Sequence, residues 1–176
     1  IEQRSPLGSF HIVAFSLSFE NDYLNIMRIL HAGGIPPLQR DRNERMPLII
    51  AGGIAVFLNP EPLADIFDLF VIGEAEDVLS ELMTAAGGVI GEKMWKDSLL
   101  KACSGMNGLY APAAYDVSYR ESGCIDTYTA AAPFPQQVYA RHIKKLSDYH
   151  GSSCILTPHT EFSNMVLTEA TRGCPH

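Results

Sequence analysis

Four cysteines carry the most distinctive chemistry of this chain, because a thiolate can act as a nucleophile or bind a soft metal. They stand at Cys103, Cys124, Cys154 and Cys174. No two of them form a C-x-x-C pair, so their spacing predicts neither a zinc site nor a disulfide framework. We therefore expect the first three to be small buried hydrophobic residues in a protein of the reducing cytoplasm.

Two pairs of acids could supply a general acid and a general base, namely Asp65 with Asp68 and Glu74 with Glu76. The first pair is more simply interpreted as solvated or capping acids. The second pair fits the first turn of a helix, where acids complement the free N–H groups. The chain also lacks the G-x-S-x-G and H-E-x-x-H motifs, so hydrolase chemistry is not predicted.

Glycines end two short apolar runs in residues 47–76, the stretch around which the chain is organised. Residues 48–51 stop at Gly52 and Gly53, and residues 69–72 stop at Gly73. Such runs suit strands that are buried on both faces of a parallel sheet. Glycine at their carboxyl ends either lets the backbone approach a ligand or only forms a turn, and the turn is favoured here. Between the runs we expect a short helix that residues 59–62 open and residues 63–67 continue.

The remaining segments extend this α/β pattern. We expect a strand over residues 10–18, a helix capped by Asn21, an exposed and mobile charged loop over residues 36–45, and a helix after Gly73 that breaks at Gly87-Gly88. A further helix is predicted over residues 92–103, an antiparallel hairpin over residues 115–129 and a last strand over residues 164–169. The predicted fold is a partial doubly wound parallel sheet of flavodoxin or Rossmann type with a small β-hairpin appendage.

Composition narrows the function further. The chain has 176 residues and a net charge of −7. Because no basic stripe is available to replace counterions, a nucleic acid is not expected as the main partner. No apolar run approaches the roughly 20 residues that span a membrane. The first residue is Ile1 rather than methionine, and we expect the chain to be a piece of a longer protein.

Three blocks of the sequence together resemble radical S-adenosylmethionine (SAM) enzymes that carry an N-terminal cobalamin-binding-like domain. FHIVAFSLS at residues 10–18 is similar to a strand of that domain. LIIAGG at residues 48–53 and NPEPLADIFDLFVIGEAED at residues 59–77 resemble its Gly-Gly strand, its proline-containing loop and its Gly-Glu-x-Glu segment. TEATRGCPH at residues 168–176 resembles the strand that enters the radical SAM barrel.

The resemblance implies a set of cofactors for the full-length parent. In the family, a Cys-x3-Cys-x2-Cys motif holds a 4Fe-4S cluster whose open iron binds SAM. Cys174 stands at the first position of that motif, so it is the implied metal ligand. One cysteine cannot hold the cluster, so no bound cofactor is expected in residues 1–176 themselves.

The resemblance also assigns a cofactor pocket. Ser16, Ser18, Gly52 and Gly53 match the positions that line the family's nucleotide-tail pocket. Cobalamin itself lacks support, because the Asp-x-His-x-x-Gly motif that binds cobalt from below is absent from the sequence.

These blocks predict three parts of the chain. Residues 1–107 form a cobalamin-binding-like domain that is incomplete at its N-terminus, residues 108–162 a hairpin appendage and linker, and residues 163–176 the start of a radical SAM barrel. The implied function is that of a noncatalytic N-terminal domain of a radical SAM iron–sulfur enzyme. It would position a cofactor or substrate, with the barrel of the same chain as its partner.

Two alternatives remain open at this point. The chain could be a stand-alone Rossmann-like module that binds a nucleotide or phosphate, although it lacks both G-x-G-x-x-G and G-x-x-x-x-G-K-[ST]. It could instead be a protein-interaction module that presents an edge strand of the hairpin at residues 115–129.

Overall fold

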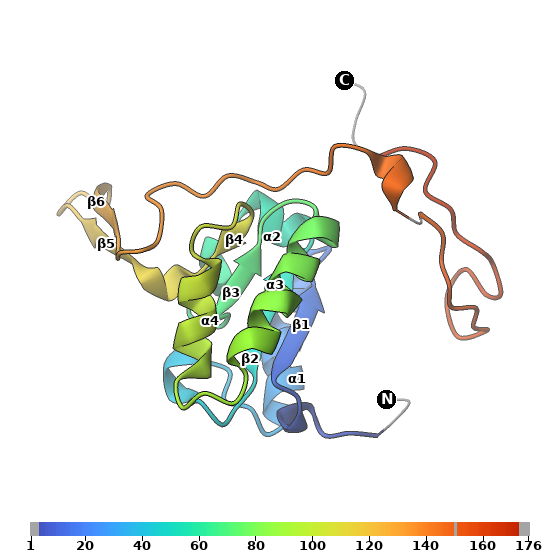
Figure 1. Ribbon diagram of the computed structural model, residues 1–176, viewed down its shortest axis with the longest axis horizontal. Coiled ribbons are helices and arrows are strands. Elements are labelled where there is room, and N and C mark those ends of the chain that lie inside the picture. The colour runs from blue at the N-terminus through green and yellow to red at the C-terminus, as the bar shows by residue number, and fades with distance from the viewer. Residues whose placement is uncertain (1–3, 150, 173–176) are drawn as a thin grey trace. The chain divides into compact units, whose positions relative to one another are not determined.

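The computed structural model describes residues 4–149 and 151–172, and the chain divides into two compact units, Ile1–His142 and Ile143–His176. The first unit contains a four-stranded sheet in the order β1-β2-β3-β4 (Figure 1). Strands β1 (Ile12–Ser16), β2 (Leu48–Gly52) and β3 (Leu69–Val71) are parallel, and β4 (Leu109–Tyr110) pairs antiparallel with β3. The predicted α/β class with a mainly parallel sheet is confirmed. The domain boundaries predicted at residues 107 and 162 stay predictions.

Strand β2 is the centre of the packing, as its apolar composition predicts. Its residues 48–51 are at most 2% exposed, and they alternate between two hydrophobic clusters on opposite faces of the sheet. Ile49 and Ala51 pack in the cluster that contains residues of α1 (Tyr23–Ala32) and α2 (Ile54–Leu58). Leu48 and Ile50 pack in the cluster that contains residues of α3 (Ala75–Val89) and α4 (Trp95–Cys103). The sheet is therefore covered on both faces, as expected for parallel strands.

Three predicted helix boundaries are wrong. The helix between β2 and β3 is α2, which begins directly after Gly53, while the proline-containing segment forms only a 3-10 turn over Glu61–Leu63. Helix α3 continues through Gly87-Gly88 to Val89, because its buried face outweighs a glycine penalty of about 1 kcal/mol per residue. Asn21 lies inside a 3-10 turn (Glu20–Asp22) rather than at the cap of α1.

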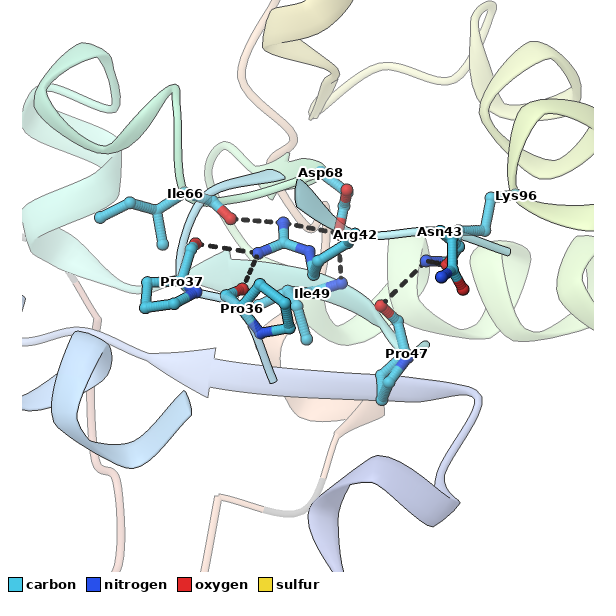
Figure 2. Close-up of polar contacts among 9 residues, drawn as sticks. All are labelled: Pro36, Pro37, Arg42, Asn43, Pro47, Ile49, Ile66, Asp68 and Lys96. Atoms are coloured by element: carbon cyan, nitrogen blue, oxygen red, sulfur yellow. Dashed lines mark hydrogen bonds and ion pairs between the residues drawn. The ribbon is translucent and has the colours of Figure 1, made fainter. Parts of the chain in front are cut away.

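The charged loop over residues 36–45 is also not the exposed segment that its composition predicts. The Arg42 side chain is 1% exposed, and its guanidinium donates to the carbonyl oxygens of Pro36 (3.1 Å), Pro37 (2.9 Å) and Ile66 (2.5 Å). It also pairs with Asp68 at 3.1 Å (Figure 2). Asp68 is thus neither solvated nor a helix cap. Five donors in a fixed fork let one buried arginine hold several loop carbonyls at once.

Helix α4 contacts the same loop from its first turn. Lys96 Nζ donates to the carbonyl oxygens of Asn43 at 2.7 Å and Pro47 at 3.2 Å (Figure 2). Trp95 Nε1 donates to the carbonyl oxygen of Glu44 at 2.9 Å. Burial lowers the pKa of Lys96, since desolvation disfavours its charged form. The basic side chains of Arg42 and Lys96 thus bind carbonyl oxygens of the protein's own backbone.

The predicted hairpin is present as β5 (Tyr115–Tyr119) and β6 (Ile125–Ala130). A chain of ring contacts connects it to the core: Phe70 to Tyr110 at 6.0 Å, Tyr110 to Tyr115 at 5.1 Å and Tyr115 to Tyr128 at 5.2 Å between centroids. The hairpin, which belongs to the first unit, is therefore packed against the four-stranded sheet through aromatic side chains.

In the second unit, the strand predicted over residues 164–169 does not form. Within the described residues of that unit, a single bridge between Ser152 and Thr168 replaces it.

Candidate functional site

Three of the four predicted pocket residues lie together at the carboxyl edge of the sheet. Ser16 ends β1, Gly52 ends β2, and the parallel register places them opposite each other. With Gly53 they line a cavity of about 230 Å³, whose other walls include Val71 and Ala75. Ser18 does not line this cavity. Binding by these residues stays a prediction.

The conformation of Gly53 is explained by the protein's own backbone rather than by a ligand. Its φ is +99°, and a Cβ at this position would lie 2.5 Å from the carbonyl oxygen and 2.8 Å from the amide nitrogen of Leu17. That carbonyl accepts the N–H of Ala55 at 3.1 Å, so the segment after β1 crosses directly over the start of α2. Only glycine combines the positive φ with this approach.

Gly73 serves a similar purpose at the end of β3. Its φ is +103°, and a Cβ there would clash with the backbone of Arg141. The N–H of Arg141 donates to Ile72 at 2.9 Å, and Arg141 accepts from the N–H of Glu74 at 2.8 Å. A returning segment around Arg141 therefore covers the chain just beyond β3, while Val71 at the end of β3 still lines the cavity with the ends of β1 and β2.

The cavity walls are mainly hydrocarbon. Ser16 contributes a hydroxyl, while Ile50, Val71, Ala75 and Leu79 contribute alkyl groups, and no lysine or arginine of the described ranges lines the space. Phosphate groups are normally bound by basic side chains and by helix N-termini with free N–H groups. The cavity is therefore suited to a small apolar group that accepts or donates one hydrogen bond, and it does not favour the nucleotide alternative.

Acidic residues at the N-cap and in the first two turns of α3 lie beside basic side chains of the returning segment. Arg141 lies 2.6 Å from Glu81 and 3.6 Å from Asp77, and His142 Nδ1 lies 4.0 Å from Glu74. Glu74 occupies the N-cap position but makes no capping hydrogen bond with its side chain. These acids therefore hold the segment in place, which the sequence alone does not indicate because the partners are some 60 residues apart.

The cysteines differ from one another. Cys103 is buried as predicted, and burial raises the pKa of its thiol to about 11. Cys124 and Cys154 are exposed, which corrects the expectation that both are buried, because they lie in the hairpin loop and in a segment without regular structure. Cys174 lies outside the described residues. Among the described residues no group of three histidine, cysteine or acidic side chains could hold a metal ion.

A second cavity is not indicated by any sequence motif. It has a volume of about 390 Å³ and is lined by Glu61, Tyr110, Tyr128 and Tyr139 among others. Tyr110 is 5% exposed and donates its hydroxyl to Glu61 Oε1 at 2.6 Å. These residues come from a 3-10 turn, two strands and the segment after the hairpin, so only the folded chain brings them together.

Fold and cavity together define an α/β domain with a mainly parallel sheet and a pocket at the carboxyl edge of that sheet. A family model described as "Radical SAM proteins, N-terminal" matches residues 1–112. The protein therefore belongs to the radical SAM family, and this part of it is the family's N-terminal domain. The suspected family relationship is confirmed.

One curated relative and one structural finding complete the comparison. An uncharacterized protein of Methanocaldococcus jannaschii is 28% identical over 104 residues, which are 56% of this chain and 22% of the relative. The chain thus spans about a fifth of the length of this curated relative. No solved structure matches the chain significantly. Every helix within the described residues is too short or too polar to cross a membrane.

Proposed function

We propose that this chain is the noncatalytic N-terminal part of a radical SAM iron–sulfur enzyme, where it positions a cofactor or substrate for a barrel of the same protein. The observation that carries the proposal is the family match over residues 1–112. The cavity at the ends of β1 and β2 supports it, because open α/β sheets bind ligands at the carboxyl ends of their strands.

Cys174 is proposed as the first ligand of the 4Fe-4S cluster in the full-length protein, by its position in the sequence Glu-x-x-Arg-Gly-Cys. When bound, such a cluster supplies the electron that cleaves SAM. The described residues contain no set of ligands that fits the cluster. The part proposed for residues 4–142 is therefore binding and orientation, and no step of the chemistry is assigned to their side chains.

Hydroxocobalamin is the probe that tests a cofactor role for the carboxyl-edge cavity. If the cavity serves cobalamin, the native sequence should cause a saturable change in the visible spectrum of this probe. Ala75→Leu, which fills the cavity at the first residue of α3, should weaken this binding at least tenfold, and Ala102→Leu on the exposed side of α4 should not. If the native protein causes no spectral change, or if Ala75→Leu binds as well, the pocket does not serve cobalamin and only the substrate role is left.

A further inference from the structure

The cavity around Glu61 has a chemical character that differs from that of the carboxyl-edge pocket. Besides Glu61 it is lined by Tyr128 and Tyr139, and its lining also includes Ile72 and Val138. A neighbouring cavity of about 330 Å³ shares Glu61 and Tyr110 and adds Asp65, Tyr115 and Tyr119. A volume of 390 Å³ lies within the range of small-molecule sites, which is about 300–1,000 Å³.

The charged side chains that line the two cavities are all negative. Glu61 and Asp65 are the carboxylates on their walls, and no lysine, arginine or histidine among the described residues lines either space. The whole chain carries a net charge of −7. An anion would meet repulsion here, whereas a cation would meet carboxylates and tyrosine faces.

The carboxylate of Glu61 is held in place without a basic partner. The Tyr110 hydroxyl donates to its Oε1 at 2.6 Å, and the Tyr110 ring is fixed between Phe70 and Tyr115. Burial, with Glu61 beside it, raises the pKa of Tyr110, so this hydroxyl stays a donor at neutral pH. Within the part of the chain that the structure describes, no ion pair neutralises Glu61.

We propose that this cavity binds an organic ammonium ion, with Glu61 as its counter-ion and the rings of Tyr128 and Tyr139 as its aromatic walls. Both rings are accessible, since Tyr128 is 36% and Tyr139 64% exposed. Aromatic faces attract a cation through the negative charge of their π system, and a carboxylate adds a direct charge interaction. The proposal does not depend on the radical SAM function or on the carboxyl-edge pocket.

Choline and its neutral carbon isostere, 3,3-dimethyl-1-butanol, are the probes that separate charge from shape. The 176-residue chain is labelled with ¹⁵N and titrated with each compound while amide chemical shifts are recorded. Choline should cause saturable shifts centred on Glu61, Tyr128 and Tyr139. The alcohol should bind at least tenfold more weakly, because it fills the same space without the charge.

Substitutions then locate the site. Glu61→Gln keeps an oxygen for the Tyr110 hydroxyl but removes the charge, and it should weaken choline binding about tenfold, as expected when an ammonium loses its carboxylate partner. Tyr139→Leu removes an exposed aromatic ring from the cavity wall and should weaken choline binding several-fold. Glu20→Gln changes the net charge equally at an exposed position outside the cavity and should have no effect. Equal binding of choline and the alcohol, the absence of saturable shifts, or Glu61→Gln within twofold of the native chain would overturn the proposal.

Discussion

A single buried ion pair fixes the loop that precedes β2. The Arg42 and Asp68 side chains are 1% and 7% exposed, so neither charge is solvated by bulk water. Asp68 Oδ2 also accepts the N–H of Ile49 at 2.7 Å, which ties the pair to β2 itself. Breaking a buried pair leaves the remaining charge uncompensated, and this is more damaging than replacing both partners by apolar groups.

Asp68→Ala should therefore lower the free energy of unfolding by about 3 to 5 kcal/mol, as measured by urea denaturation. Asp65→Ala, three residues earlier and exposed, is the matched control and should change it by about 0.5 kcal/mol or less. The double change Arg42→Met with Asp68→Leu should recover only the part of the loss that is due to the uncompensated charge, because the backbone groups that these side chains bind then lose their partners. A small effect of Asp68→Ala would show that the pair is not closed in solution.

Cys103 should make stability depend on pH in the alkaline range. Its pKa is raised from the ordinary value of 9.0 to about 11 in the folded protein, so the unfolded chain loses the thiol proton first. The contribution of the protonated Cys103 thiol to the free energy of unfolding is fully present below pH 9. It is lost as the pH rises toward 11, by up to about 2 to 3 kcal/mol. In urea denaturation, the free energy of unfolding of Cys103→Ala should decline less steeply between pH 9 and pH 11 than that of the native protein. Cys124→Ala, at an exposed thiol, should decline as the native protein does.

Among the elements, the turn from β2 into α2 is the most tightly constrained. Gly53 combines a φ of +99° with the close approach of Leu17, whereas Gly34 has a φ of +70° and open space around a Cβ. Gly34→Ala should thus lower the free energy of unfolding only by the strain of placing alanine at a positive φ, about 1 to 2 kcal/mol. Gly53→Ala should lower the free energy of unfolding by clearly more, because the backbone of Leu17 must also move to make room for the Cβ. Equal melting temperatures for the two variants would contradict the crossing of these segments.

The helices and strands also show which features of the fold can be predicted from the sequence and which cannot. The apolar runs at residues 48–51 and 69–72 suffice to predict parallel strands, because complete burial on both faces leaves no polar alternation. The helix after Gly53 was missed because the neighbouring prolines give the stronger local signal, although they form only a 3-10 turn. Local propensity cannot reveal that Leu17 packs on the turn and starts the helix there.

In the candidate sites, too, local patterns can be predicted from the sequence, whereas contacts between distant segments cannot. Ser16 and Gly52 could be placed together from the sequence, since parallel strands end at the same edge of a sheet. The role of Arg42 could not be predicted, because a charged loop is normally solvated and its partners Ile66 and Asp68 are 24 and 26 residues away. Glu61 and Tyr110 are 49 residues apart, and no local pattern of the sequence indicates that they meet.

At the scale of the whole molecule, the central proposal is that this domain is part of a larger radical SAM enzyme. The chain spans about a fifth of the relative from Methanocaldococcus jannaschii, and the family match ends at residue 112. The cluster ligand is proposed at Cys174, at the opposite end of the chain from the carboxyl-edge pocket in sequence. Iron binding therefore tests the link between the two parts.

The most direct measurement is made on a longer protein that continues the reading frame past His176, after anaerobic reconstitution with iron and sulfide. The account predicts a broad absorbance band near about 400 nm, the expectation for a thiolate-bound iron–sulfur cluster, and its loss in Cys174→Ala. Cys154→Ala, at an exposed thiol outside the motif, should keep the band. A longer protein that binds no iron, or a band that survives in Cys174→Ala, would contradict the proposal that Cys174 is a cluster ligand.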